Sequence, residues 1–199
     1  SQQSTASEGH RTSALDDSRI FKTLSQCAMS VNIEIKARSR DFQGQMALAA
    51  DLADTGPHLI HQRDTFFHVS RGRLKLRDFG NGKGELIQYD RPDQGGPKKS
   101  TYSLVAVAEP DSMRGVLADS LGIRGEVVKR RTLFLAGSTR IHFDEVEGLG
   151  DFIELEVVMA PDQPPQEGHD TARQLMSDLA IQSEDLIDGA YIDLLESRL

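Results

Sequence analysis

The stretch Val31–Arg38, VNIEIKAR, decides the fold that we predict for this chain. In a β-strand, successive side chains point to opposite faces. One face then carries Val, Ile, Ile and Ala, and the other carries Asn32, Glu34, Lys36 and Arg38. The stretch therefore predicts a strand with one buried apolar face and one charged face. An ordinary half-exposed strand looks the same, so the pattern gains weight only because it recurs along the chain.

The composition is that of a soluble globular protein. The chain has 199 residues, of which 38% are hydrophobic and 27% charged, enough for one domain with a substantial core. A net charge of -8 argues against a general nucleic-acid or anionic-membrane binder. No apolar run approaches the roughly eighteen residues of a membrane helix. Cys27 is the single cysteine, so no internal disulfide can form and a cytoplasmic location is expected.

The first 29 residues are rich in Ser, Thr, Gln and Asp and show no sustained period. We predict that they are disordered or weakly helical. Met29 directly precedes the first strand and is a candidate natural start, which would make residues 1–28 an extension. One domain is predicted over residues 30–199.

The rest of the chain alternates strands with a few helices. Asp41 predicts a helix N-cap, and that helix should end at Gly56–Pro57. Asn81-Gly82 predicts a hairpin turn. Strands are predicted over residues 61–69, 73–77, 85–91, 101–108, 125–135, 139–146 and 151–159. Helices are predicted over residues 110–122, 170–182 and 184–197. The pattern indicates an α+β domain of about eight strands, mostly antiparallel.

Charged residues gather on one face of these strands. Exposed ion pairs contribute only about 0–1 kcal/mol each, so a flat sheet gains little from such a face. A small closed barrel would turn the charges inward and has room for one small ligand. Glu85 and Arg91 fit either the interior or the rim. The cations of this face are Lys36, Arg38, Arg73, Lys75, Arg77, Lys129, Arg131 and Arg140, and the carboxylates are Glu34, Asp144, Glu154 and Glu156.

This set of residues suits a polyphosphate and a divalent cation. Arg offers forked N–H donors and Lys a point charge to phosphate oxygens. Glu154 and Glu156, two residues apart on one strand, place two hard oxygen ligands for Mg²⁺ or Mn²⁺ on the same face. Each motif alone is weakly specific, but together they indicate a polyphosphate-binding barrel. A plain interaction module with solvated charges remains the alternative.

The ordered motifs resemble the CYTH, or triphosphate tunnel, superfamily, and within it the class IV adenylyl cyclase-like branch. The likeness runs from about residue 31 to the C-terminus. It implies an eight-stranded antiparallel β-barrel with flanking helices that binds a triphosphate such as ATP or tripolyphosphate, with no nucleic-acid or membrane partner and a possible homodimer. The matching motifs are NIEIKAR, QRDTFF followed by GRLKLR, ELIQYDRP, VVKRRTLF, TRIHFDEVEGLGDFIELE and AYIDLL.

The resemblance also implies roles for individual residues. Glu34, Glu154 and Glu156 would bind Mg²⁺ or Mn²⁺. Lys36, Arg140 and Asp144 would be catalytic, with Asp144 orienting a cation. The phosphates would be held by Lys36, Arg38, Lys75, Arg77, Lys129, Arg131 and Arg140.

Two positions depart from the pattern of the superfamily. Asn32 replaces the first Glu of its ExExK motif, and an uncharged amide oxygen would leave one metal site weak or lost. Tyr191 stands where some triphosphatases carry a late Lys, which leans away from the thiamine-triphosphatase type.

Three functions stay open from the sequence. A cyclase would convert ATP to cyclic AMP and diphosphate, and a triphosphatase would direct water to the terminal phosphorus of an inorganic or organic triphosphate. A third reading is a non-catalytic triphosphate-binding protein. His142, beside Arg140 and Asp144 on the charged face, is interpreted as a structural hydrogen-bonding residue rather than a general base.

Overall fold

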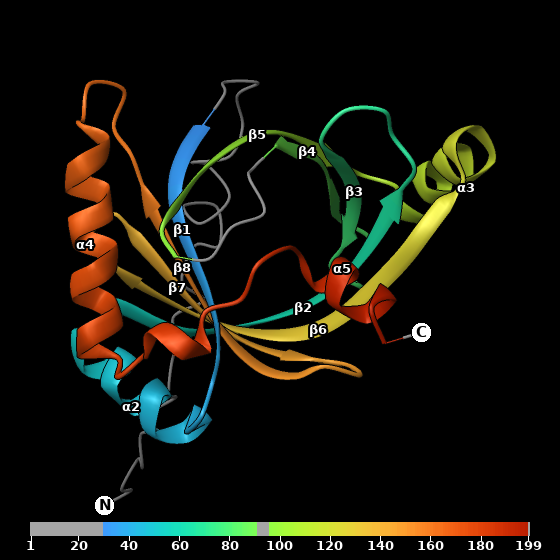
Figure 1. Ribbon diagram of the computed structural model, residues 1–199. Helices are drawn as coiled ribbons and strands as arrows, with labels where there is room; N and C mark the ends of the chain where they lie inside the picture. The colour runs from blue at the N-terminus through green and yellow to red at the C-terminus, as the bar shows by residue number, and fades with distance from the viewer. Residues whose placement is uncertain (1–29, 91–95, 199) are drawn as a thin grey trace, which may run out of the picture.

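The computed structural model describes residues 30–90 and 96–198, and the predictions for residues 1–29 and for Arg91 fall outside these ranges. Eight antiparallel strands form a closed barrel in the order β1-β5-β4-β3-β2-β6-β7-β8, with β8 pairing back to β1 (Figure 1). The predicted barrel is confirmed. Its strands are β1 (Ser30–Arg38), β2 (Thr55–Phe67), β3 (Arg73–Asp78), β4 (Gly84–Asp90), β5 (Lys98–Val107), β6 (Ile123–Ala136), β7 (Thr139–Val146) and β8 (Gly150–Val158).

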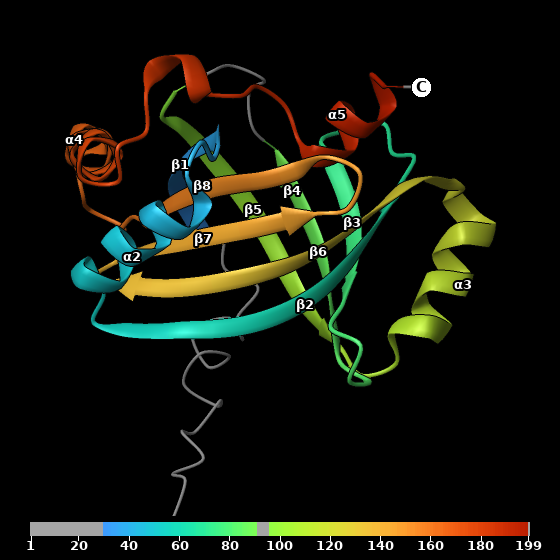
Figure 2. The ribbon, with the colours of Figure 1, turned by 90° about the horizontal axis from the view of Figure 1, so that it is seen from below.

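The helices cover the barrel from outside and at one end. In Figure 1, α2 and α4 lie on one side and α3 on the other. Figure 2 shows β2, β6, β7 and β8 side by side, with α5 near the end of β3. The helices are α2 (Phe42–Leu52), α3 (Pro110–Leu121), α4 (Pro165–Asp178) and α5 (Tyr191–Glu196), and a 3₁₀ turn spans Ser183–Asp185.

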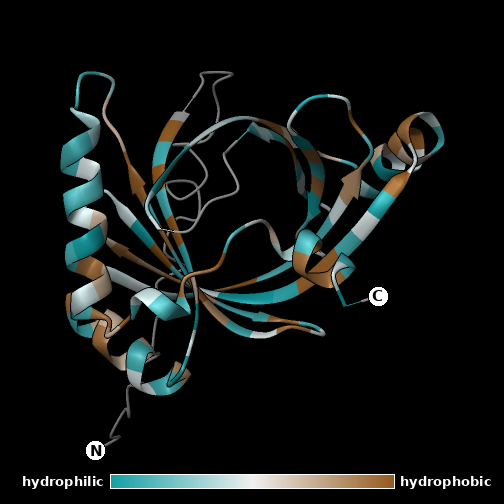
Figure 3. Cartoon of the chain, in the orientation of Figure 1, coloured by the Kyte–Doolittle hydropathy of each residue, from teal (hydrophilic) through white to brown (hydrophobic). Residues whose placement is uncertain are grey.

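Along each strand, successive side chains point alternately to the apolar outer face of the barrel and to its charged lumen. In Figure 3 this alternation appears as a change of hydropathy along the strands. Ile35, Ile141 and Phe143 are fully buried on the outer face of the barrel, in the core that includes α2 and α4. On the other side, Leu76 belongs to the cluster that packs under α3. Because side chains alternate strictly in a strand, burying the apolar set outside forces the charged set inward.

The N-terminal helix is shorter than predicted. It ends at Leu52, and β2 already begins at Thr55. Gly56 and Pro57 therefore lie within β2, at a register shift between Thr55 and His58 in the pairing with β6. The prediction was wrong because a Gly-Pro pair can occupy a β-bulge as well as end a helix. The long strand β6 supplies pairing partners for β2 as far back as Thr55.

The C-terminal region also differs from the prediction. A helix over residues 184–197 was expected, but a 3₁₀ turn spans Ser183–Asp185 and only Tyr191–Glu196 is α-helical. Ahead of it, the Ile187 N–H donates to the Lys36 carbonyl at 3.0 Å and Gly189 adopts a φ of 74°. The hydrogen bond of Ile187 and the bridge between Ala37 and Leu186 hold this segment extended along β1, so tertiary hydrogen bonds override the helical periodicity.

Asp41 caps α2 as predicted, since its Oδ1 accepts from the Gly44 N–H at 3.0 Å. We expect Asp41→Ala to lower the free energy of unfolding by about 1 kcal/mol, because the first turn of α2 loses the side-chain acceptor for one of its free N–H groups. Urea unfolding followed by circular dichroism measures this loss. Asp51→Ala, an exposed change in the same helix, serves as control; equal effects would contradict the cap.

None of the helices in the described ranges is both long and apolar enough to cross a membrane.

Candidate functional site

The lumen of the barrel is lined by charged side chains of both signs. Register and alternation place seven cations and six carboxylates on the inner face, contributed by all of the strands. Most of these residues are buried. The cations are Lys36, Lys75, Arg77, Lys98, Lys129, Arg131 and Arg140, and the carboxylates are Glu34, Asp64, Glu85, Asp144, Glu154 and Glu156.

Asp144 is the centre of one buried cluster, which we call the Asp144 cluster. Its Oδ1 accepts from Arg131 Nε at 2.6 Å, and its Oδ2 accepts from Arg131 Nη2 at 2.7 Å. Lys129 Nζ also donates to Oδ2, at 3.1 Å. Tyr191 of α5 reaches into the lumen and donates its hydroxyl to the same oxygen at 3.0 Å. Asp144 thus fixes the positions of Arg131 and Lys129.

A second cluster, the Asp64 cluster, repeats this arrangement on β2 and β3. Asp64 accepts from Arg77 Nε at 2.8 Å and from Arg77 Nη2 at 2.9 Å, and Lys75 Nζ donates to Oδ2 at 2.7 Å. In both clusters a Lys-x-Arg strand faces an aspartate on its neighbour, and the aspartate holds the Arg with two bonds. Both guanidinium groups are therefore fixed, with Nη1 outside these bonds.

The electrostatics of the clusters keep the aspartates ionised. Burial pushes the pKa of Asp144 upward, but Arg131 and Lys129 outweigh it and hold that pKa far below its usual range. The pKa of Asp64 is likewise held low, because Arg77 and Lys75 outweigh burial. Burial, with repulsion from Arg131, lowers the pKa of Lys129 to about 7. Burial thus brings the titration of Lys129 near neutrality.

Glu154 connects the Asp144 cluster to β1. Its Oε2 lies 3.1 Å from Lys36 Nζ and 2.9 Å from Arg131 Nη2. Lys36 Nζ also lies 3.8 Å from the centre of the Tyr191 ring. The predicted catalytic Lys36 is therefore buried between a carboxylate and an aromatic face, which holds its ammonium in place.

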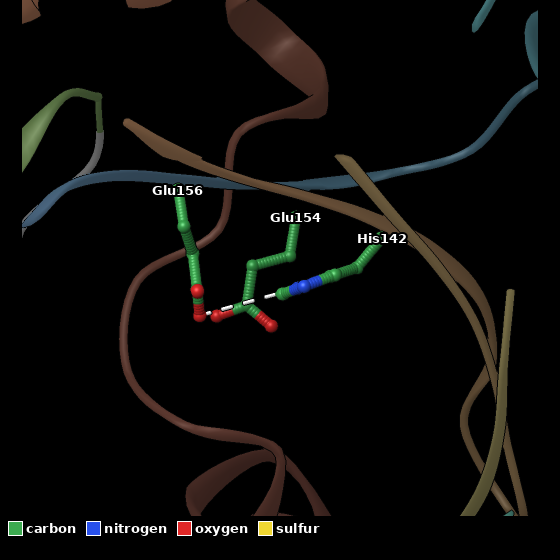
Figure 4. Close-up of side chains that lie close together, drawn as sticks. All are labelled: His142, Glu154 and Glu156. Atoms are coloured by element: carbon green, nitrogen blue, oxygen red, sulfur yellow. Dashed lines mark ion pairs between the residues drawn. The ribbon is translucent and has the colours of Figure 1, made fainter. Parts of the chain in front are cut away.

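The predicted metal residues gather at the junction of β1, β8 and β7. Glu34 is paired in register with Glu156. Ligand atoms of His142, Glu154 and Glu156 lie within 4.8 Å of one another (Figure 4). Burial and repulsion from Arg131 lower the pKa of His142 to about 3, so the imidazole is neutral. Two carboxylates and a neutral imidazole are a donor set that fits a divalent cation.

Arg140 sits beside this group. Its Nε donates to Glu156 Oε2 at 2.7 Å. In the amide orientation that satisfies both ends of the side chain, the Asn32 oxygen accepts from Arg140 Nη2 at 3.1 Å and its NH₂ donates to the Val31 carbonyl. Burial pushes the pKa of Glu156 upward, but Arg140 outweighs it and brings that pKa to about 2. Glu156 is therefore a carboxylate at neutral pH.

Two predicted cations lie toward the ends of the barrel. Arg38 is exposed, with its guanidinium 5.0 Å from the centre of the Phe152 ring. Arg73 donates to Asp193 of α5 at 2.9 Å, and Arg124 pairs with the same carboxylate at 2.6 Å. The remaining predicted residues lie together in the lumen.

Sequence reasoning missed three residues of the lumen. Asp64 lies within the QRDTFF motif and shares its face with Phe66, so strand parity alone could have placed it inside. Lys98 is fully buried and paired in register with Glu34, but the predicted strand began after it. Tyr191 was noted only for replacing a lysine, and no local pattern shows that it reaches Asp144. Glu85, left between lumen and rim, is buried in the lumen.

A closed antiparallel barrel of eight strands, lined by paired acids and bases, defines the chain as a tunnel-type β-barrel protein. Residues 30–191 match the CYTH domain, so the chain belongs to the CYTH domain family.

Similarity to individual proteins agrees with this family. The chain is 24% identical to adenylate cyclase CyaB of Aeromonas hydrophila over 84% of its own length and 90% of the relative. The PH1012 protein of Pyrococcus horikoshii has a TM-score of 0.73 at 23% identity, covering 82% of this chain and 98% of that one. The Hippeastrum adenylyl cyclase homologue HpAC1, described as having a dominant triphosphatase activity, has a TM-score of 0.62 at 14% identity, covering 85% and 96%.

Proposed function

We propose that this protein binds a triphosphate in the lumen of its barrel together with Mg²⁺ or Mn²⁺, and cleaves it. The observation that carries the proposal is the pair of matched clusters in which Asp144 and Asp64 each fix a Lys and an Arg inside a closed barrel. Enclosing seven cations in one lumen, four of them buried and three half-buried, is costly. A stretch of several negative phosphoryl groups is the ligand that this arrangement would neutralise best.

The cations are preorganised for this ligand. Asp144 and Asp64 use the Nε and Nη2 donors of Arg131 and Arg77, which leaves the Nη1 donors for phosphate oxygens. Glu154 likewise holds Lys36, and Glu156 holds Arg140, so both cations lie beside the carboxylates that would hold the divalent cation. Fixed donors need little reorganisation as charge develops on the leaving oxygen.

Glu34, Glu154 and Glu156 would hold the divalent cation, which when bound neutralises phosphate charge and orients the reacting groups. Glu154 and Glu156 fit this role because their low pKa keeps them charged at neutral pH. Asp144 holds Arg131 and Lys129 in place through the reaction, and the ring of Tyr191 restricts the position of Lys36.

We propose the conversion of ATP to cyclic AMP and diphosphate as the first reaction to test, because CyaB is an adenylate cyclase. In that reaction the ribose 3′-oxygen would attack the α-phosphorus. Hydrolysis at the terminal phosphorus is the second candidate, favoured by the triphosphatase activity reported for the Hippeastrum homologue. Both reactions would use the same clusters and differ in which phosphorus meets the nucleophile.

The test is to incubate the pure protein with ATP, GTP, thiamine triphosphate and tripolyphosphate, each with Mg²⁺ or Mn²⁺. Cyclic AMP with diphosphate would identify a cyclase, and free phosphate a triphosphatase. Calorimetric binding of tripolyphosphate without turnover of any compound would show a non-catalytic binder, as Asn32 allows. If no triphosphate binds, the proposal fails.

The pKa of Lys129 gives a pH prediction. Above pH 7 the side chain of Lys129 is mostly neutral and cannot form an ion pair with phosphate. A bound polyanion raises the pKa of Lys129, so the protein takes up a proton when the ligand binds. The affinity therefore falls as the pH rises. We expect the affinity for tripolyphosphate to fall by roughly tenfold or more between pH 6.5 and 9. Lys129→Arg keeps its charge and should lose much less.

Calorimetry of both proteins at each pH measures this difference, and the titration of the ligand cancels in the ratio of the two affinities. Arg130→Lys, on the neighbouring exposed position, should follow the wild-type profile. Parallel profiles for wild type and Lys129→Arg would contradict the assignment of Lys129 to phosphate binding.

A further inference from the structure

His142 is a buried histidine whose Nδ1 has no hydrogen-bond partner. It lies in the middle of β7, with 3% of its surface exposed, and is paired in register with Glu154 of β8. An unpaired buried nitrogen acceptor or donor costs free energy, so it needs an explanation. The hydrogen-bonding role expected for His142 does not explain Nδ1, because this atom makes no hydrogen bond with any described residue.

The Nδ1 atom faces the carboxylate of Glu156, and Glu154 belongs to the same group of possible ligands. Nδ1 lies 3.9 Å from Glu156 Oε1, too far for a hydrogen bond. The ion pairs of Glu154 and Glu156 with Lys36, Arg131 and Arg140 all end on Oε2 of each glutamate. The Oε1 atom of Glu156 takes no part in these pairs and is turned toward the imidazole, as Figure 4 shows.

The spacing suits a shared ion. The three ligand atoms lie within 4.8 Å of one another. Metal–ligand distances of about 2.0–2.2 Å would require them to approach one another by about 1–2 Å, a shift that small side-chain rotations supply. Asn32 does not complete this group, because its amide oxygen accepts from Arg140.

We propose that His142 ligates the divalent cation through Nδ1, together with Glu154 and Glu156, and so makes this site prefer Mn²⁺ over Mg²⁺. The inference rests on the proposed function for the location of the metal, and adds a nitrogen ligand and a choice of ion. Magnesium takes oxygen ligands and keeps its waters, whereas Mn²⁺ is a first-row transition-metal ion that accepts a nitrogen ligand beside carboxylates. A nitrogen donor at this position replaces the ligand that Asn32 no longer provides.

The test measures Mn²⁺ and Mg²⁺ binding to the metal-free protein without any triphosphate. We expect Mn²⁺ to bind at least about tenfold more tightly than Mg²⁺, with Mn²⁺ followed by the loss of its free EPR signal and Mg²⁺ by competition. In His142→Gln this ratio should fall to about threefold or less, with Mg²⁺ affinity unchanged within about threefold. His61→Gln, an exposed histidine on β2, should behave as wild type.

Pulsed EPR of the Mn²⁺-loaded wild type gives a reading that needs no variant to fold. Coupling to a directly bound nitrogen is expected, shifted by ¹⁵N-histidine labelling, retained in His61→Gln and lost in His142→Gln. Mn²⁺ bound without nitrogen coupling would overturn the inference, and so would equal affinities for the two ions. Binding of tripolyphosphate with Mg²⁺, measured by calorimetry, does not depend on ligation by His142. If the inference about His142 fails but tripolyphosphate still binds, the proposed function stands.

Discussion

Asp144→Asn is expected to destabilise the fold more than any other single change that we predict, by about 3–5 kcal/mol. The carboxylate receives two bonds from Arg131, one from Lys129 and one from Tyr191. Asparagine keeps the shape but removes the charge, so the buried Arg131 guanidinium loses the carboxylate that holds it with two bonds and keeps only its single contact with Glu154. Lys129 can lose its proton at little cost, because its pKa is about 7, whereas Arg131 cannot.

Thermal and urea unfolding measure this effect, which corresponds to a melting temperature lower by about 10 °C for a domain of this size. The matched control is Glu145→Gln on the same two strands. Glu145 pairs with Arg130 in the adjacent register position, but 42% and 72% of these side chains are exposed, so we expect a loss below about 1 kcal/mol. Equal losses in the two variants would show that burial of the Asp144 cluster contributes nothing.

Glu156→Gln is expected to lower metal-dependent turnover by more than about tenfold. The change removes a charged metal ligand and the carboxylate that holds Arg140 at 2.7 Å. Steady-state kinetics at increasing Mn²⁺ and Mg²⁺ distinguish the two losses, since a weakened metal site is partly restored by excess metal. Circular dichroism and a thermal melt establish that the variant is folded.

Glu147→Gln is the control for this experiment, because Glu147 is exposed in the turn before β8 and belongs to neither the Asp144 cluster nor the group of possible metal ligands. We expect its turnover to equal that of wild type. Turnover of Glu156→Gln within twofold of wild type would contradict the assignment of Glu156 to the metal site and leave Glu154 and Glu34 as the ligands to test.

Strand parity could be predicted because it is a local property. The alternation in Val31–Arg38 and in the strand of Lys129 and Arg131 required no knowledge of neighbours, and closure of the sheet then placed both charged faces inside. Element ends were less predictable, since β2 begins early through its pairing with β6. The final helix is short for the same kind of reason: the Ile187 N–H bonds to the carbonyl of Lys36.

The sequence by itself determined which residues share a face, because the two-residue period of a strand fixes the direction of each side chain. Only the tertiary structure decided which charges meet. Asp64 joins Arg77 and Lys75 across two strands, and Tyr191 reaches Asp144 from 47 residues away. Such pairs depend on the register between strands and on the path of the C-terminal segment. Both are set by contacts between distant parts of the chain, which no local pattern of residues records.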